Sequence, residues 1–68
     1  MKVKYWWSED GEIEICEKSD RVMEVDGECY HCAAKLHKGN RVCELKVLKD
    51  EDTYILCKSC AEKNTQEI

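Results

Sequence analysis

The chain has 68 residues, with 11 basic and 15 acidic side chains, six cysteines and no proline. A chain this short buries only about 60% of the surface that it exposes when unfolded, so it forms at most one domain, whose core alone supplies about 3–5 kcal/mol. The net charge of −4 argues against a surface that is basic throughout, and no segment approaches the ~20 apolar residues of a membrane-spanning helix. We therefore expect a single small domain, residues 1–68, that needs a further source of stability.

The N-terminal residues, MKVKYWWSEDGE, contain no apolar run of signal-peptide length. We therefore expect a cytoplasmic protein with no membrane segment, in a compartment where thiols stay reduced and paired cysteines bind metal. Six cysteines also fit a secreted scaffold with three disulfides, which remains the alternative.

The first third of the chain has the composition of short strands. Residues 2–7 are rich in β-forming side chains, and residues 12–16 alternate, with Ile13 and Ile15 on one face and glutamates on the other. Residues 21–25 are a weaker strand candidate, after a predicted break at residues 18–20. We expect an antiparallel β meander over residues 1–28, a segment with nine acidic and four basic residues.

The second half predicts a hairpin and a helix. Residues 41–48 and 53–56 flank an acidic turn and are typical of a β-hairpin. Residues 58–66 contain Ala61, Glu62 and Lys63, which favour a short helix. A helix of this length is marginal in water, so it needs an anchor at its start.

Two C-x-x-C pairs with 24 residues between them, Cys29 with Cys32 and Cys57 with Cys60, are the most specific motif. A structural zinc ion binds four thiolates in a tetrahedron with Zn–S distances of about 2.3 Å. One turn can present both sulfurs of a pair, and a distant second pair completes the tetrahedron. Such sites contribute about 10–16 kcal/mol of metal-binding energy to folding. We predict that these four cysteines bind one structural zinc ion.

A C-x-x-C turn, a hairpin entered through Lys38 and Gly39, and a C-x-x-C pair opening a helix together resemble the treble-clef zinc finger. The resemblance covers residues 29–66 and implies a knuckle at Cys29 and Cys32, with the other pair on the helix. Treble clefs act in DNA binding, ribosomal proteins, ubiquitin ligases and protein adaptors, so the function stays open. Position 33 is Ala, where zinc knuckles often have Gly. We expect a small α+β zinc domain with the meander packed beside this unit.

The other cysteines and histidines are weaker candidates. Cys16 and Cys43 lie in predicted strands, where a free cysteine is usually a small buried hydrophobe. A second metal site formed by these two and a histidine is an alternative without paired spacing. His31, inside the first C-x-x-C, is expected to point away from the ion, and His37 is an alternative ligand.

Four thiolates leave no open position on zinc, and no catalytic motif is present, so we expect no enzymatic activity. A rubredoxin-like iron site for electron transfer also uses two C-x-x-C pairs and is a third alternative. In that alternative each pair forms a turn, whereas Cys60 is followed by residues that favour a helix.

The leading hypothesis is a protein-interaction module, such as a small regulator that binds a larger protein complex. Tyr5, Trp6 and Trp7 are the predicted partner contacts, because tyrosine and tryptophan are favoured at interfaces. The alternative is a nucleic-acid-binding zinc finger that contacts phosphates through basic residues of the hairpin region. These residues are Lys35, Lys38, Arg41, Lys46 and Lys49.

Overall fold

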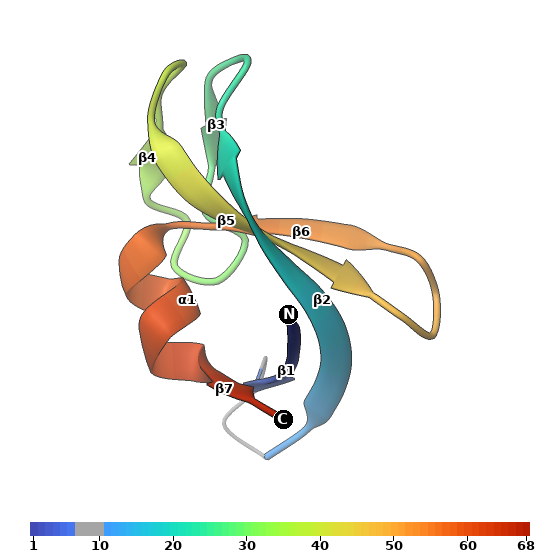
Figure 1. Cartoon of the computed structure of the whole chain (residues 1–68). Coiled ribbons are helices and arrows are strands. Elements are labelled where there is room, and N and C mark those ends of the chain that lie inside the picture. The colour runs from blue at the N-terminus through green and yellow to red at the C-terminus, as the bar shows by residue number, and fades with distance from the viewer. Residues whose placement is uncertain (7–10) are drawn as a thin grey trace.

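The computed structural model describes residues 1–6 and 11–68 and forms a small α+β domain (Figure 1). Trp7, one of the predicted partner contacts, lies outside the described residues. The elements in chain order are β1 Lys2–Trp6, β2 Ile13–Val22, β3 Gly27–Glu28, β4 Lys35–Leu36, β5 Arg41–Val47, β6 Thr53–Leu56, α1 Lys58–Asn64 and β7 Thr65–Glu67.

Five strands form one antiparallel sheet in the order β6-β5-β2-β1-β7, and β3 pairs with β4 in a separate two-stranded ribbon. Helix α1 lies across from the curved β2, on the inner side of the sheet (Figure 1). The N-terminal segment was expected to pack beside the C-terminal unit. It instead supplies β1 and β2 to the same sheet, because β2 pairs with β1 on one side and with β5 on the other.

Strand β2 is one continuous strand of ten residues, so the predicted break at residues 18–20 is wrong. Each residue of that predicted break has a partner on β5, and the ladder of backbone hydrogen bonds outweighs the weak strand propensity of Ser and Asp. The Asp20 side chain stays outside the core and accepts a 2.8 Å hydrogen bond from Lys58.

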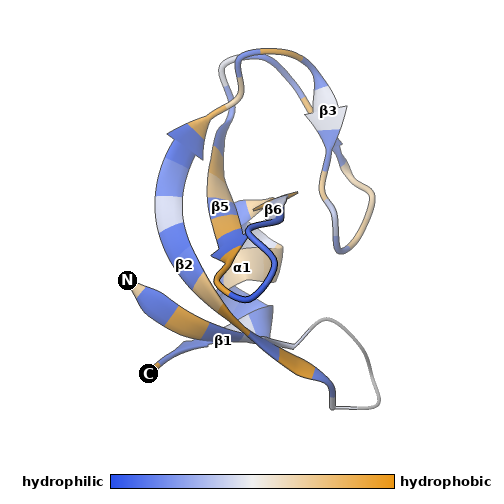
Figure 2. Cartoon of the chain, turned by 90° about the vertical axis from the view of Figure 1, so that its right-hand side faces the viewer, coloured by the Kyte–Doolittle hydropathy of each residue, from blue (hydrophilic) through white to orange (hydrophobic). Residues whose placement is uncertain are grey.

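The faces of β2 alternate as expected, but the isoleucine face is the open one. Ile13 and Ile15 keep 45% and 40% of their surface exposed, whereas Cys16 and the facing Val3 and Val47 are buried. Figure 2 shows apolar residues at the N-terminal end of β2, where the strand extends past its pairing with β5 but remains paired with β1. The alternation of side chains in the sequence distinguishes the two faces of the strand, but it does not show which face is buried.

The predicted hairpin is confirmed as β5 and β6, with Lys46 opposite Thr53 and an acidic turn between the strands. The helix begins at Lys58 as predicted but ends at Asn64, two residues early. The chain then becomes extended at Thr65 and forms β7, which pairs with β1. A sequence window cannot detect this strand, because its partner is at the other end of the chain.

One cluster of buried side chains joins the two parts of the chain. It contains Val3 and Tyr5 from β1, Leu45 from β5, Leu56 from β6 and Ala61 from α1, each at most 1% exposed. Burying one leucine contributes about 1.5–3 kcal/mol, so the sheet and the helix stabilise each other. In the described part of the chain, no helix is long and apolar enough to cross a membrane.

Candidate metal centre

The sulfur atoms of Cys29, Cys32, Cys57 and Cys60 all lie within 4.8 Å of one another. Cys32 Sγ and Cys57 Sγ, which come from different pairs, are 3.9 Å apart. Four sulfurs placed about 2.3 Å from one ion in a tetrahedron would be about 3.8 Å apart, so the spacing fits a metal ion of this kind. Among the described residues this is the one group of three or more potential ligands gathered at metal-binding distance.

The first pair lies at the tip of the ribbon formed by β3 and β4. Cys29 N donates to Ala34 O at 2.8 Å and Ala33 N donates to Cys29 O at 2.9 Å, which closes the turn between the two cysteines and β4. Ala33 has a φ of 61°, in the left-handed region that glycine adopts most easily. The alanine thus adopts the conformation for which many zinc knuckles use glycine.

The second pair lies at the start of α1. Cys57 is the N-cap residue, and its Sγ accepts a 3.5 Å hydrogen bond from Cys60 N. Cys57 N in turn donates to Cys29 Sγ at 3.3 Å, which links the two pairs directly. Hydrogen bonds from backbone amides to sulfur stabilise thiolates, the form that binds metal.

The four thiols do not ionise alike. Burial disfavours the charged form of Cys29, but hydrogen bonds from the backbone of Cys32, Cys57 and His31 outweigh it and lower the pKa of the thiol to about 6. Burial, and then the neighbouring thiols, raise the pKa of Cys60. One thiolate is therefore well accommodated, while several require a cation to offset their mutual repulsion.

The two residues inside the first pair attach the ribbon to the large sheet. The Tyr30 ring stacks on Tyr54 of β6 with centroids 4.0 Å apart and an interplanar angle of 15°. His31 Nδ1 lies 3.0 Å from the Tyr5 hydroxyl, and Tyr30 N donates to Ile55 O at 2.8 Å. The sequence prediction missed these contacts. Their only signal was two aromatic side chains within a C-x-x-C motif.

Two of the three predicted partner contacts, Tyr5 and Trp6, lie in different environments in the structure. Tyr5 is fully buried near Cys29 and Cys60 of the four-cysteine group, so its assignment as a partner contact is wrong. Trp6 is half-buried and lies opposite Ile13 in the β1–β2 ladder. Because directly paired residues share a face, Trp6 belongs to the outer face that carries the exposed isoleucines.

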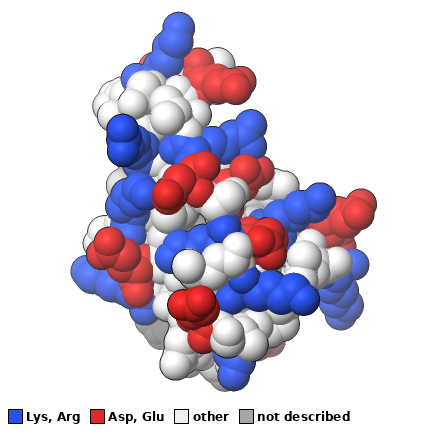
Figure 3. Space-filling model, in the orientation of Figure 1, with Lys and Arg blue, Asp and Glu red and all other residues white. Residues whose placement is uncertain are grey.

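The five basic residues proposed for nucleic-acid contact are all exposed, but they are spread over the length of the hairpin region. Lys35 and Lys38 lie in or after β4, Arg41 begins β5, and Lys46 and Lys49 lie near its far end. Acidic side chains lie among them, and Figure 3 shows blue and red side chains interspersed on the face it draws. The described residues therefore do not bring these five together in one basic patch.

The remaining cysteines occupy the positions expected of small buried hydrophobes. Cys16 and Cys43 are 0% and 3% exposed and lie in the core, outside the four-cysteine group. His37 also lies outside that group, with its backbone amide bound to Asn40 Oδ1 at 2.8 Å. The described residues thus contain no second metal-ligand cluster involving these side chains.

No protein-family model, curated protein or solved structure matches this chain.

Proposed function

We propose that Cys29, Cys32, Cys57 and Cys60 bind one zinc ion and that residues 29–66 form a treble-clef-type zinc finger. The proposal is supported by the converging sulfurs and by the order of elements, in which a C-x-x-C turn precedes a hairpin and a helix that begins at the second pair. The ion would supply folding energy by joining two distant segments. Four thiolates would fill its coordination, so we propose a structural role with no catalysis.

The geometry of the second pair favours zinc over a rubredoxin-like iron. Cys57 caps α1 and Cys60 is within its first turn, so the second pair opens a helix instead of forming a second isolated turn. Purified protein distinguishes the two metals directly, because ferric thiolate sites are red and zinc sites are colourless.

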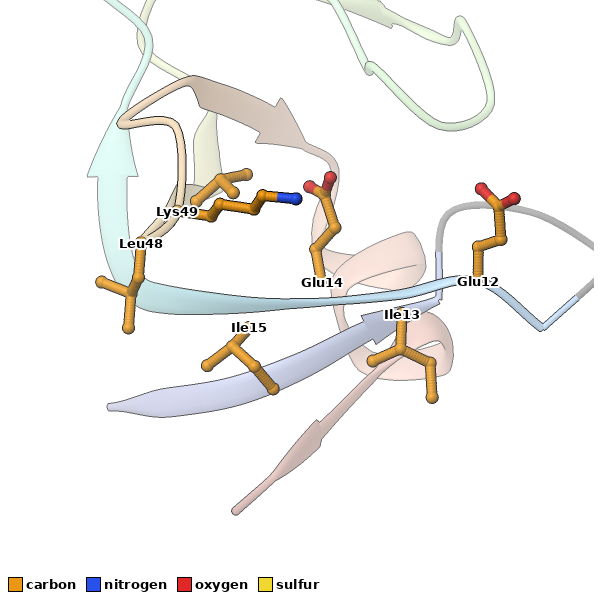
Figure 4. Close-up of a pocket in the computed structure, with 7 residues that line it drawn as sticks. Glu12, Ile13, Glu14, Ile15, Leu48 and Lys49 are labelled. Atoms are coloured by element: carbon orange, nitrogen blue, oxygen red, sulfur yellow. The ribbon is translucent and has the colours of Figure 1, made fainter.

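We further propose that the protein is a non-enzymatic protein-interaction module in a reducing, cytoplasmic compartment. The observation that carries this proposal is the apolar surface on the outer face of β1 and β2. Ile13, Ile15 and Leu48 are 40–45% exposed there, and their side chains point to the same side (Figure 4). Half-buried Trp6 extends this surface across β1. Clustered apolar side chains on a protein this small indicate a binding surface.

Capture of a stoichiometric partner from the native host tests this function. We expect the tagged, zinc-loaded chain to retain a protein that Trp6→Ala and Ile13→Ser release. Val25→Ser is the matched control, because Val25 is 70% exposed but lies in the turn after β2. Failure of the wild-type chain to retain any protein, together with salt-sensitive retention of DNA or RNA, would instead support the nucleic-acid alternative.

A further inference from the structure

Strand β2 has a free edge at its N-terminal end. It pairs with β1 from Ile13 to Glu17, but it pairs with β5 only from Cys16 onward. The hydrogen bond from Leu48 N to Ile15 O, 3.1 Å long, is the last contact before the chain turns away toward β6. Among the described residues, no strand pairs with Ile13 on that side.

The backbone groups of Ile13 point toward this free edge. In an antiparallel sheet, alternate residues direct both their N–H and C=O groups to the same neighbour. Ile15 O is bound on the β5 side, and Lys18 N is bound on the β1 side, to Met1 O at 2.7 Å. Ile13, two residues before Ile15, therefore presents its donor and its acceptor to the open side.

A notch lies along the same edge, between the start of β2 and the end of β5. It has a volume of about 650 Å³ and is lined by residues 12–15 and 47–49. Residues 12–15 span about 13 Å in extended conformation, which is enough for a short strand to lie beside them. The notch continues the position that β5 occupies farther along β2.

The two sides of the notch differ in chemistry. Ile13, Ile15 and Leu48 point to one side, and Glu12 and Glu14 point to the other, with Lys49 on the glutamate side (Figure 4). Glu14 Oε2 is buried and finds no hydrogen-bond partner among the described residues. A buried carboxylate oxygen without a donor is costly, and a lysine or arginine entering the notch would supply one.

A second copy of this chain fits the notch poorly. Antiparallel pairing of two β2 edges centred on Glu14 would place the two Glu14 carboxylates directly opposite each other. Directly opposed like charges destabilise a strand pair. The acidic side instead favours a partner with positive charge.

We propose that the free edge of β2 binds an extended segment of a partner protein, in which apolar residues alternate with lysine or arginine. The segment adds a strand beside residues 12–15. Its apolar side chains contact Ile13, Ile15 and Leu48, and its basic side chains approach Glu12 and Glu14. This inference rests on the proposed interaction function and names the surface and the chemistry of the partner. Backbone hydrogen bonds provide affinity in such strand addition, and the side chains provide selectivity.

Labelled hexapeptides and the full, zinc-loaded chain test the proposal by fluorescence anisotropy and amide NMR. We expect a peptide of alternating valine and lysine to bind and to shift the amide signals of Ile13 and Leu48 but not that of Val25. The same peptide with glutamate in place of lysine is expected not to bind. Absence of binding by the lysine peptide at millimolar concentration would overturn the proposal.

Backbone pairing has its own test. In an extended valine–lysine peptide, the valine amides face one edge and the lysine amides face the other. We expect N-methylation of one set to abolish binding and N-methylation of the other set to preserve it, because only one edge meets β2. Equal binding of the two methylated peptides would rule out strand addition.

The charge contribution is tested by Glu14→Gln, which is expected to weaken binding of the lysine peptide about tenfold. Glu62→Gln, on the exposed surface of α1, is the control and should leave binding unchanged. Concentration-dependent shifts of the Ile13 amide without peptide would assign the edge to a second copy of the chain and overturn the proposal.

The capture experiment separates the two proposals. If the wild-type chain retains a host protein and Glu14→Gln retains it equally while free lysine peptide does not displace it, the edge inference fails and the interaction function stands. If the peptides bind as expected but the chain retains no host protein, the interaction function fails.

Discussion

The two C-x-x-C pairs lie side by side in the structure, but different interactions stabilise the segments that contain them. The first pair is at the tip of a ribbon whose strands contain two residues each, and it contacts the large sheet through Tyr30 and His31. The second pair begins a helix whose Cys60 and Ala61 are part of the core. Two-stranded ribbons are marginal on their own, so we expect the first pair to depend on the proposed metal ion and on a few side-chain contacts. We expect the second pair to depend on the proposed metal ion and on the core together.

Loss of any ligand should have the largest effect, because it removes the link between the two segments. We expect Cys57→Ser to lose stoichiometric metal and the cooperative folding transition, since the binding energy of about 10–16 kcal/mol exceeds the stability of so small a domain. Metal analysis and thermal denaturation measure this. Cys43→Ala, at a buried cysteine outside the cluster, should retain the metal. Loss of the metal from Cys43→Ala would contradict the assignment of the four ligands.

The two pairs should differ in what else a substitution disturbs. Cys32 is exposed and Cys60 is 8% exposed, so Cys60→Ser also places a hydroxyl at the edge of the core. We expect Cys60→Ser to retain less protected structure than Cys32→Ser, because placing the hydroxyl at the edge of the core costs about 1–2 kcal/mol more. Neither variant is expected to keep the cooperative folding transition, so amide hydrogen exchange of β5 and β6 makes the comparison. Equal protection in the two variants would show that the core does not support the second pair.

Removal of the Tyr30 ring should loosen the first pair and leave the second in place. We expect Tyr30→Ala to destabilise the protein by about 1–2 kcal/mol, because the stacked Tyr54 loses its partner. Tyr30→Phe keeps the ring and should lose less than half of that. Hydrogen exchange should show the added opening in residues 29–36, and uniform opening over the whole chain would contradict a local role.

A substitution at Tyr5 tests the second contact that attaches the first cysteine pair to the large sheet, the contact between the Tyr5 hydroxyl and His31. Tyr5→Phe removes the hydroxyl that bonds His31 Nδ1 and keeps the buried ring. His31 is exposed and can bond water instead, so we expect a loss of only about 0.5–1.5 kcal/mol in urea denaturation. A loss as large as that of a ligand would mean that this bond holds the ribbon in place.

The smallest expected effect is an increase in stability, at Ala33. Ala33 has a left-handed φ of 61°, and glycine there removes a steric cost of about 1–2 kcal/mol while adding flexibility to the unfolded chain. We expect Ala33→Gly to stabilise the protein by about 0.5–1 kcal/mol in thermal denaturation. Ala34→Gly, next to it and outside the left-handed region, should stabilise nothing.

The comparison of the pairs also explains how far the sequence alone could lead. The four cysteines, the hairpin and the start of the helix were predictable, because spacing and local pattern encode them. The course of β2 through Ser19 and Asp20 was not, since its pairing with β5 is a tertiary contact. Strand β7 was missed for the same reason, because its partner β1 is about sixty residues away.

The outward position of Ile13 and Ile15 could not be predicted from alternation, because the covered face depends on where α1 packs. Tyr5 illustrates the same difficulty, because a tyrosine in an N-terminal strand is equally suited to an interface and to a core. Its surroundings come from distant parts of the chain, including His31, whose Nδ1 lies 3.0 Å from its hydroxyl and which is 26 residues away in the sequence.

The claim that a single metal ion joins Cys29 and Cys32 to Cys57 and Cys60 is tested most directly by titrating the reduced chain with cobalt, a visible substitute for zinc. We expect saturation at one ion per chain, an absorption spectrum of tetrahedral thiolate coordination, displacement by one equivalent of zinc, and none of these in Cys57→Ser. A reduced chain that folds without binding cobalt, or a Cys57→Ser chain with the same spectrum, would contradict it.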